Sequence, residues 1–240
     1  MIKRRTTPYL IEFRFHGYAK KYSRRVIGQV ARRFKVRGVT HKKVVPHISL
    51  FGPFTTKDEK KMVSTFVKTL SGYKLVPFRV KGFNYFNNLT NKVIYLDIEP
   101  SKRLVELRRN LAKSMLKVTK TRSTHDPKRK FYFHATVAFK DIDRKFKNIW
   151  KYIKKQKEPE INQHLLRVTI LKNGKILKEY DLVQERLLSR SEALNRDIWK
   201  KTIRSLKSKG IQFEEEFDRH LTLWQKITKL FRKKMPYNKT

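Results

Sequence analysis

The sequence predicts an α+β fold in which one strand–helix–strand–helix pattern occurs twice. Three observations lead to this class. The 240 residues are 39% hydrophobic and 12% aromatic, which is enough to form a buried core and unlike a disordered polycation. Segments of alternating apolar residues are followed by segments with a helical period. No stretch of the sequence reaches the roughly 18 apolar residues of a membrane-spanning helix.

The first copy of the pattern begins with residues 9–15, which alternate and predict a strand. Apolar residues from Val26 to Phe34 then recur on one helical face. Residues 44–51 predict a second strand, which we expect to end at Gly52-Pro53.

A second helix is predicted next. Thr56 and Glu59 have the spacing of a capping box, and apolar residues follow at helical intervals as far as Leu70. Residues 78–83 predict another strand, which leads into an aromatic and Asn-rich loop.

The second copy starts with a strand at residues 93–98 and a helix from about Lys102 to Val118. A basic loop, residues 120–130, leads into a strand at residues 131–139. Apolar residues from Phe146 to Ile153 mark the second helix. The copies share the order of their elements without obvious identity of residues, which indicates an internal duplication.

A hairpin is predicted after the second copy, with strands at residues 166–171 and 175–182 and a turn at Asn173-Gly174. The character of the chain then becomes helical and amphipathic. We therefore divide the chain into a domain of residues 1–185 and a basic helical extension of residues 186–240.

Within the extension, Ser189 and Glu192 have the spacing of another capping box. Apolar residues from Trp199 to Leu206 predict a helix that ends near Gly210, and residues 217–231 predict one more. Packing against the domain is the expected role of these helices, with contact to a nucleic acid as a possible addition.

The net charge of the chain indicates its partner. Sixty Lys and Arg against twenty Asp and Glu give +40, spread along the whole sequence. Such a charge favours a phosphate polymer as the partner. Binding to anionic lipid is the weaker alternative. The chain has no Cys, which excludes disulfides and thiolate zinc sites and fits a cytoplasmic protein. No oligomeric state is predicted.

Two short motifs carry the predicted chemistry. His47 and Ser49 lie two residues apart on one predicted strand, and His134 and Thr136 do so on another. Residues i and i+2 of a strand share a face, so each histidine lies beside a hydroxyl. The hydroxyl can donate to a phosphate oxygen while the imidazole moves a proton.

The two motifs occupy matching positions of the duplicated pattern, 87 residues apart. Packing of the halves around a pseudo-twofold axis would place both on one phosphodiester. One histidine can then remove a proton from the attacking oxygen while the other protonates the leaving oxygen. This mechanism requires no metal and no cofactor, and none is expected.

These tetrads resemble the signature of the two-histidine (2H) phosphoesterase superfamily, a duplicated His-x-Thr/Ser followed by a hydrophobic residue. The branch most similar is the 2′-5′ RNA ligase and RNA 2′,3′-cyclic phosphodiesterase group, over residues 8–182. The resemblance implies a bilobal fold with a central cleft. It also implies metal-free opening of 2′,3′-cyclic phosphate ends to 2′-phosphates, or cleavage or reversible joining of 2′-5′ linkages. The partner that it implies is RNA, as single-stranded ends or tRNA-like molecules.

By the same resemblance, His134 is the base that activates water and His47 is the acid that protonates the leaving 3′-oxygen. Ser49 and Thr136 would hold the non-bridging oxygens. The two histidine roles can be exchanged without any change in the motifs. The alternative function is an RNA-binding protein that uses the fold as a non-catalytic platform.

A third tetrad, which begins at His220 and includes Thr222, also matches the pattern. Apolar residues around it follow a helical period, and on a helix i and i+2 diverge, so we do not expect it to be catalytic. His16, His41, His125 and His164 lack the hydroxyl partner, and we expect them on the solvated surface, His125 with some prospect of substrate contact.

Further residues are predicted to bind substrate. The basic loop brings Arg122, His125, Arg129 and Lys130 directly before the second motif, where they can contact backbone phosphates. Lys42 and Lys140 flank the motifs and can neutralise phosphate. Tyr85 and Phe86 can stack on a base, although aromatic residues in strands more often belong to the core.

Overall fold

The computed structural model describes residues 8–40, 45–87, 92–121, 123–128 and 130–208, and within them the chain forms two antiparallel sheets. The six-stranded sheet A has the order β10-β9-β8-β1-β2-β5. Its strands are β1 (Tyr9–Arg14), β2 (His47–Thr55), β5 (Lys120–Thr121), β8 (Arg167–Lys172), β9 (Lys175–Asp181) and β10 (Arg186–Leu188).

The four-stranded sheet B has the order β6-β4-β3-β7. Its strands are β3 (Val76–Asn87), β4 (Lys92–Pro100), β6 (His134–Phe139) and β7 (Glu160–Leu165). The helices are α1 (Gly17–Phe34), α2 (Glu59–Leu70), α3 (Lys102–Leu116), α4 (Phe146–Lys154), α5 (Arg190–Leu194) and α6 (Arg196–Ser208), with a 3₁₀ turn at Asp143–Lys145. Among the described helices, none is both long and apolar enough to cross a bilayer.

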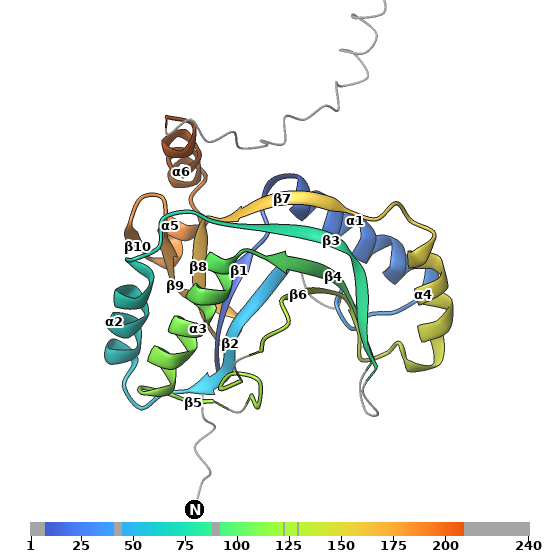
Figure 1. Ribbon diagram of the computed structural model, residues 1–240, viewed down its shortest axis with the longest axis horizontal. Coiled ribbons are helices and arrows are strands. Elements are labelled where there is room, and N and C mark those ends of the chain that lie inside the picture. Colours follow the sequence, from blue (N-terminus) through green and yellow to red (C-terminus); the bar gives the residue numbers. More distant parts are fainter. Residues whose placement is uncertain (1–7, 41–44, 88–91, 122, 129, 209–240) are drawn as a thin grey trace, which may run out of the picture.

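The duplicated pattern is confirmed in three dimensions. In the first copy α1 connects β1 and β2, which pair in sheet A; in the second copy α3 connects β4 and β6, which pair in sheet B. Each helix also reaches the opposite sheet, because α1 packs on β6 and β7 and α3 contacts β2. Figure 1 shows α1 and α4 on the side of sheet B and α2 and α3 on the side of sheet A. The α+β class is therefore confirmed.

The two sheets share one hydrophobic core. Phe13 of β1 and Phe78 of β3 meet edge to face with ring centroids 5.1 Å apart, which joins sheet A to sheet B. The predicted stripe of α3 is fully buried at Leu104, Leu107 and Leu111. Because the core is continuous, the strands that carry the two motifs are held in a fixed relation.

Three local expectations are wrong. Strand β2 does not end at Gly52-Pro53 but continues to Thr55, because Phe54 pairs with Tyr9 of β1 and with Thr121 of β5. Asp58, not Thr56, caps α2, and its carboxylate accepts from the backbone N–H of Lys61 at 2.9 Å. Residues 84–87 are not a loop but the end of β3, paired with β4.

Candidate active site

Both motifs lie on strands and present histidine and hydroxyl on one face, as predicted. In β2, Ile48 and Leu50 are fully buried, whereas His47 and Ser49 are only half-buried. In β6, Ala135 and Val137 are buried, and His134 and Thr136 are half-buried. The apolar residues of each strand anchor it in the core and leave the polar pair on the accessible face.

The two imidazoles are oriented in the same way. Nδ1 of His47 lies 2.8 Å from the carbonyl oxygen of Val45, and Nδ1 of His134 lies 3.0 Å from that of Tyr132. A carbonyl oxygen can only accept, so each Nδ1 carries the proton and donates. Nε2 is therefore the nitrogen that gains or loses a proton in both rings.

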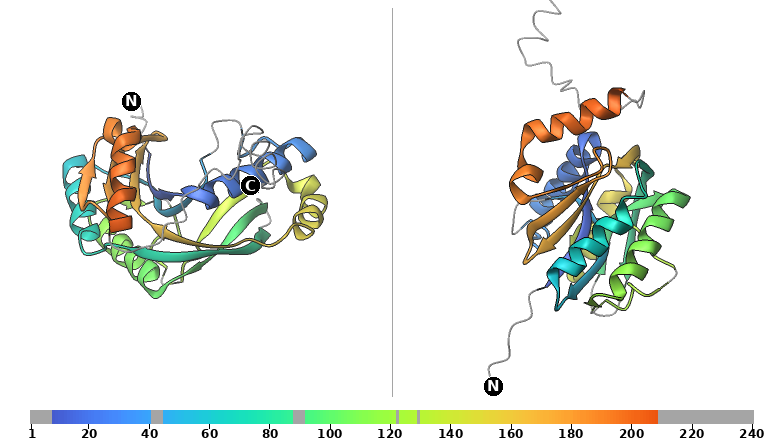
Figure 2. Two further views of the ribbon diagram at one scale, coloured as in Figure 1. Left: turned by 90° about the horizontal axis from the view of Figure 1, so that it is seen from above. Right: turned by 90° about the vertical axis from the view of Figure 1, so that its left-hand side faces the viewer.

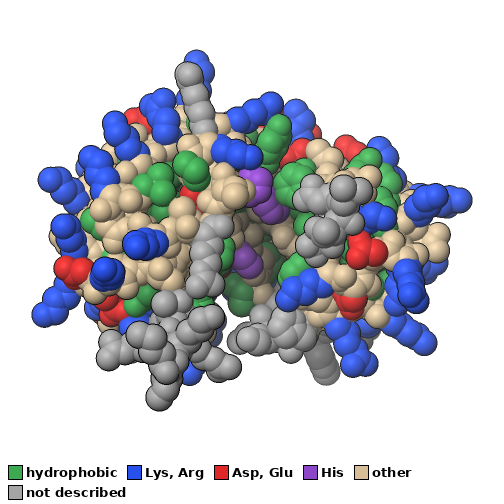
Figure 3. All heavy atoms as spheres, turned by 90° about the horizontal axis from the view of Figure 1, so that it is seen from below, with side chains coloured by type: hydrophobic (Ala, Val, Ile, Leu, Met, Phe, Trp, Pro, Cys, Tyr) green, Lys and Arg blue, Asp and Glu red, His purple; other side chains and the backbone are tan. Residues whose placement is uncertain are grey.

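The structure brings the two motifs together. Strands β2 and β6 are in contact across the junction of the two sheets, and the charge of His47 acts on His134. Figure 3 shows histidine side chains inside a hollow between two blocks of the surface. A substrate bound where β2 meets β6 would lie near both rings.

His134 lies in an aromatic environment. Its ring centroid is 5.0 Å from that of Phe86 and 5.1 Å from that of Tyr95. Burial lowers the pKa of His134, and the positive charge of His47 lowers it further, while the hydrogen bond to Tyr132 and the carboxylate of Asp97 oppose the shift. The ring is thus neutral at pH 7, as a general base must be.

His47 lies beside a buried carboxylate instead. Its Nε2 is 3.6 Å from Oε2 of Glu12, an ion-pair distance when the ring is protonated. Glu12 is only 2% exposed, and its Oε1 accepts from Nε of Arg14 at 2.9 Å. Sequence reasoning missed Glu12; the signal was an acidic residue on the polar face of the alternating strand at residues 9–15.

The loop before the second motif is anchored by a buried ion pair that sequence reasoning also missed. Arg108 of α3 donates to the carbonyl oxygens of Leu50, Lys128 and His125, and its Nη2 lies 3.6 Å from Oδ1 of Asp126. The Asp126 carboxylate accepts from the N–H of Gly52 at 3.0 Å. The pair therefore ties the loop to α3 and to the strand that carries His47.

The predicted substrate-binding residues are not all in one place. Phe86 packs on His134, but Tyr85 lies on the other face of β3, against Phe146 and Trp150. His125 is near enough to His134 for its charge to lower that pKa.

The two described lysines of the set differ in position. Lys130 lies 5.3 Å from the ring centroid of Tyr132, which is itself next to Phe86. Lys140 follows the opposite end of β6 from His134 and lies over the ring of Phe139. Lys42, Arg122 and Arg129 lie outside the described residues, as do His41, His220 and Thr222.

The expected surface position of His16 is wrong. The side chain is buried, its Nε2 lies 2.7 Å from the carbonyl oxygen of His164, and its ring packs near Trp199 of α6. Burial lowers the pKa of His16 to about 4, so it is neutral at pH 7. The reason is the C-terminal segment, which covers this part of the domain.

Comparison with known proteins gives one match by sequence and several by structure. A family model described as 2′-5′ RNA ligase superfamily matches residues 23–175. A crystal structure of a phosphoesterase has a TM-score of 0.47 and 11% identity, over 73% of this chain and 98% of that chain.

Usb1 of Kluyveromyces marxianus has a TM-score of 0.42 and 11% identity, over 71% of this chain and 94% of that chain. The structure of the same protein with uridine monophosphate has a TM-score of 0.42 and 10% identity, over 71% and 96%. Among curated proteins, no match was found.

Proposed function

This chain belongs to the 2′-5′ RNA ligase superfamily, and on that premise we propose that it hydrolyses 2′,3′-cyclic phosphate ends of RNA to 2′-phosphates. Cleavage or joining of 2′-5′ linkages is the related reaction, since the same two proton transfers serve it. The observation that carries the proposal is the pair of imidazoles, each with Nδ1 fixed on a backbone carbonyl and Nε2 left to exchange a proton.

In the proposed reaction, Nε2 of His134 removes a proton from water as the water oxygen attacks phosphorus. The bond between phosphorus and the 3′-oxygen breaks, and Nε2–H of His47 donates its proton to that oxygen. The products are a 2′-phosphate and a 3′-hydroxyl. One proton has moved onto His134 and one has left His47, so exchange with solvent restores both rings.

The surroundings of the rings support this division of roles over the exchanged one. Burial among Phe86 and Tyr95 keeps His134 neutral, as a base requires. His47 has no such aromatic enclosure, and its Nε2 lies 3.6 Å from the Oε2 atom of Glu12, which can orient the ring as the acid. Ser49 and Thr136 lie beside the two rings on the same face and are proposed to donate to the non-bridging oxygens.

The proposal is tested with a short RNA that ends in a 2′,3′-cyclic phosphate, incubated with the protein in EDTA. We expect turnover to persist in the chelator. His47→Ala and His134→Ala should each lower kcat at least about 100-fold, since each removes one proton-transfer group. Tight RNA binding without turnover of this RNA or of 2′-5′-linked RNA would favour the platform function. Turnover that disappears with EDTA would exclude the metal-free mechanism.

A further inference from the structure

The face of sheet A that carries His47 extends well beyond the motif. Arg14 of β1 is opposite His47 and Glu12 is opposite Ser49. On the other side of β1, Glu12 is opposite Thr169 of β8. Residues directly opposite one another in antiparallel strands project to the same face. The polar surface next to the histidine therefore continues onto β8.

The same row continues from β8 to β9. Thr169 is opposite Glu179, and Arg167 is opposite Asp181. Arg167, Glu179 and Asp181 are all buried, although they lie on the polar face of the sheet. Helices α5 and α6, which follow β10, cover them, and Figure 2 shows these helices beside sheet A.

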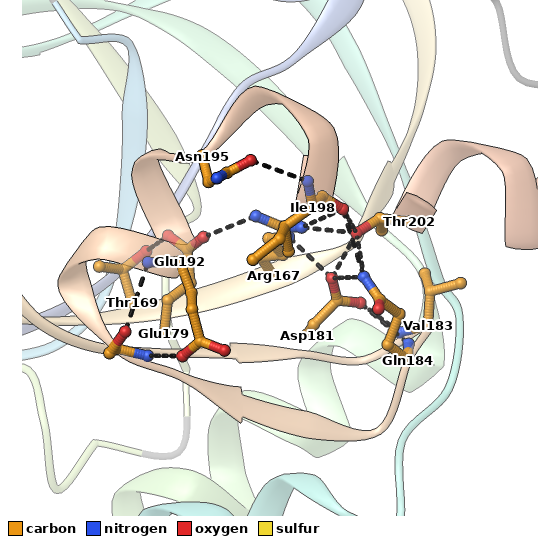
Figure 4. A network of polar contacts seen from close by, with 11 residues as sticks. Arg167, Thr169, Glu179, Asp181, Val183, Gln184, Glu192, Asn195, Ile198 and Thr202 are labelled. Carbon is orange, nitrogen blue, oxygen red and sulfur yellow. Dashed lines mark hydrogen bonds and ion pairs between the residues drawn. The ribbon is translucent and has the colours of Figure 1, made fainter. Parts of the chain in front are cut away.

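A polar network fixes α6 on this face (Figure 4). Nε of Arg167 donates to Asp181 at 2.8 Å, and Nη2 of Arg167 donates to the carbonyl oxygen of Ile198 at 3.3 Å. The hydroxyl of Thr202 donates to Asp181, and Gln184 donates to Thr202 at 2.7 Å. A small apolar cluster adds to the contact, formed by Leu166, Val183, Ile203 and Leu206. Helix α6 is therefore held on this face of sheet A by both polar and apolar contacts.

Between α5–α6, the start of α1 and the sheet lies a cavity of about 320 Å³. Arg14, Lys20 and Arg196 are basic residues of its lining, and Glu179 is the acidic one. Glu179 accepts from Thr169 at 2.6 Å and from Arg167 at 3.3 Å, so its charge is compensated from within the protein. Basic side chains therefore outnumber acidic ones in the lining, although Arg14 is itself paired with Glu12.

Arg14 connects the cavity to the candidate active site. Its Nε donates to Oε1 of Glu12, and Oε2 of Glu12 is the atom beside Nε2 of His47. Glu12 and Arg14 therefore connect the imidazole of His47 to the lining of the cavity, on the same face of the sheet.

We propose that this cavity binds the next nucleotide of the RNA, through the phosphate that links it to the terminal nucleotide and through its ribose. Arg14, Lys20 and Arg196 would contact the phosphate, and the exposed side chain of Asn195 would contact the sugar. A volume of this size lies within the range of pockets that hold small molecules. The inference rests on the proposed function for the position of the terminal phosphate.

The test compares Arg196→Ala with the matched variant Arg204→Ala. Both arginines are exposed on α6, but Arg204 does not line the cavity. Each variant is assayed with a nucleoside 2′,3′-cyclic monophosphate and with an oligoribonucleotide that ends in the same group. Arg196→Ala should raise KM about tenfold for the oligoribonucleotide alone, with kcat unchanged. Arg204→Ala should leave both substrates unaffected.

Equilibrium binding of a fluorescent oligoribonucleotide separates this inference from the proposed function. Weaker binding by Arg196→Ala than by Arg204→Ala supports the cavity even if the wild-type protein turns over neither substrate. Equal binding of the oligoribonucleotide by the two variants would overturn the proposal that the cavity binds RNA, whether or not the protein turns over either substrate. Ala193→Trp, which would fill the cavity from α5, should reproduce the effect of Arg196→Ala.

Discussion

At the scale of single residues, two chemically identical imidazoles are set apart by what surrounds them. His134 lies between the rings of Phe86 and Tyr95, where burial disfavours its charged form. His47 lies next to a carboxylate instead, with its Nε2 3.6 Å from Oε2 of Glu12. A pair of proton-transfer groups needs this asymmetry, because one must hold a proton while the other lacks it.

The base role of His134 predicts a specific pH dependence. Because burial holds the pKa of His134 below the usual range of a histidine, the acid-side decline of kcat/KM should occur at lower pH than an exposed histidine would give. Asp97 raises this pKa, so Asp97→Asn should move the decline to still lower pH. The measurement is kcat/KM against pH for both proteins. A decline that moves to higher pH in Asp97→Asn would contradict the role.

The acid role of His47 predicts the behaviour of Glu12→Gln. The substitution removes the carboxylate that lies 3.6 Å from Nε2 of His47 and orients the ring, so kcat on the cyclic phosphate should fall about 10- to 100-fold with little change in KM. On a nitrophenyl phosphodiester, whose leaving group needs no proton, kcat of Glu12→Gln should fall much less. An equal loss of kcat on both substrates would mean that Glu12 only stabilises the fold. A lower melting temperature of Glu12→Gln would then confirm that structural role.

The sequence predicts part of this site for a physical reason. The i, i+2 relation between His47 and Ser49 is local to one strand, so it can be recognised without knowledge of the fold. Glu12 reaches His47 only through the register of β1 on β2. Arg108 interrupts the apolar stripe of α3, but its partner Asp126 lies in a loop whose path the sequence does not reveal.

At the scale of elements, the loop before β6 depends on α3. Arg108 and Asp126 are both almost fully buried, and burial raises the pKa of the Asp126 carboxyl against the opposing effects of Thr121, Gly52 and Arg108. Loss of one partner leaves a buried charge without compensation.

Arg108→Met should therefore lower the free energy of unfolding by about 3 kcal/mol, measured by urea denaturation. The double variant Arg108→Met with Asp126→Asn should recover part of that loss, because it removes the orphaned charge as well. A single-variant loss within about 0.5 kcal/mol, typical of surface positions, would refute the anchoring role.

Elements with a long apolar period were predictable, whereas elements that depend on pairing were not. Helices α1, α2, α3 and α4 and the hairpin β8–β9 follow from their patterns. Strand β7 was missed, and β10, only three residues long, has little pattern of its own; each is defined by its neighbour in the sheet. The extension of β2 beyond Gly52-Pro53 is likewise produced by β1 and β5, which override a local turn signal.

At the scale of the whole molecule, the charge of +40 is spread along the sequence, and Figure 3 shows Lys and Arg side chains on both sides of the hollow. Under the proposed function, the groups at the two histidines carry out the chemistry and the surrounding cations attract the RNA. The position of α6 on the face of His47 was not predictable, since Arg167, Asp181 and Thr202 meet only in the folded chain.

This division predicts how salt acts. The affinity for single-stranded RNA should fall linearly with salt on logarithmic axes, with a slope of about −0.7 per phosphate neutralised. The value of kcat at saturating RNA should change little over the same range. The measurement is a titration of labelled RNA at several salt concentrations beside steady-state kinetics. An affinity for RNA that does not change with salt would mean that the net positive charge does not contribute to substrate binding.

The most direct test of the proposed chemistry is hydrolysis of a 2′,3′-cyclic phosphate end in heavy-oxygen water, followed by mass spectrometry of the terminal nucleotide. If His134 activates water and His47 protonates the 3′-oxygen, the product carries one heavy oxygen in a phosphate attached to the 2′-position. A phosphate at the 3′-position, or a product without the heavy oxygen, would contradict the account.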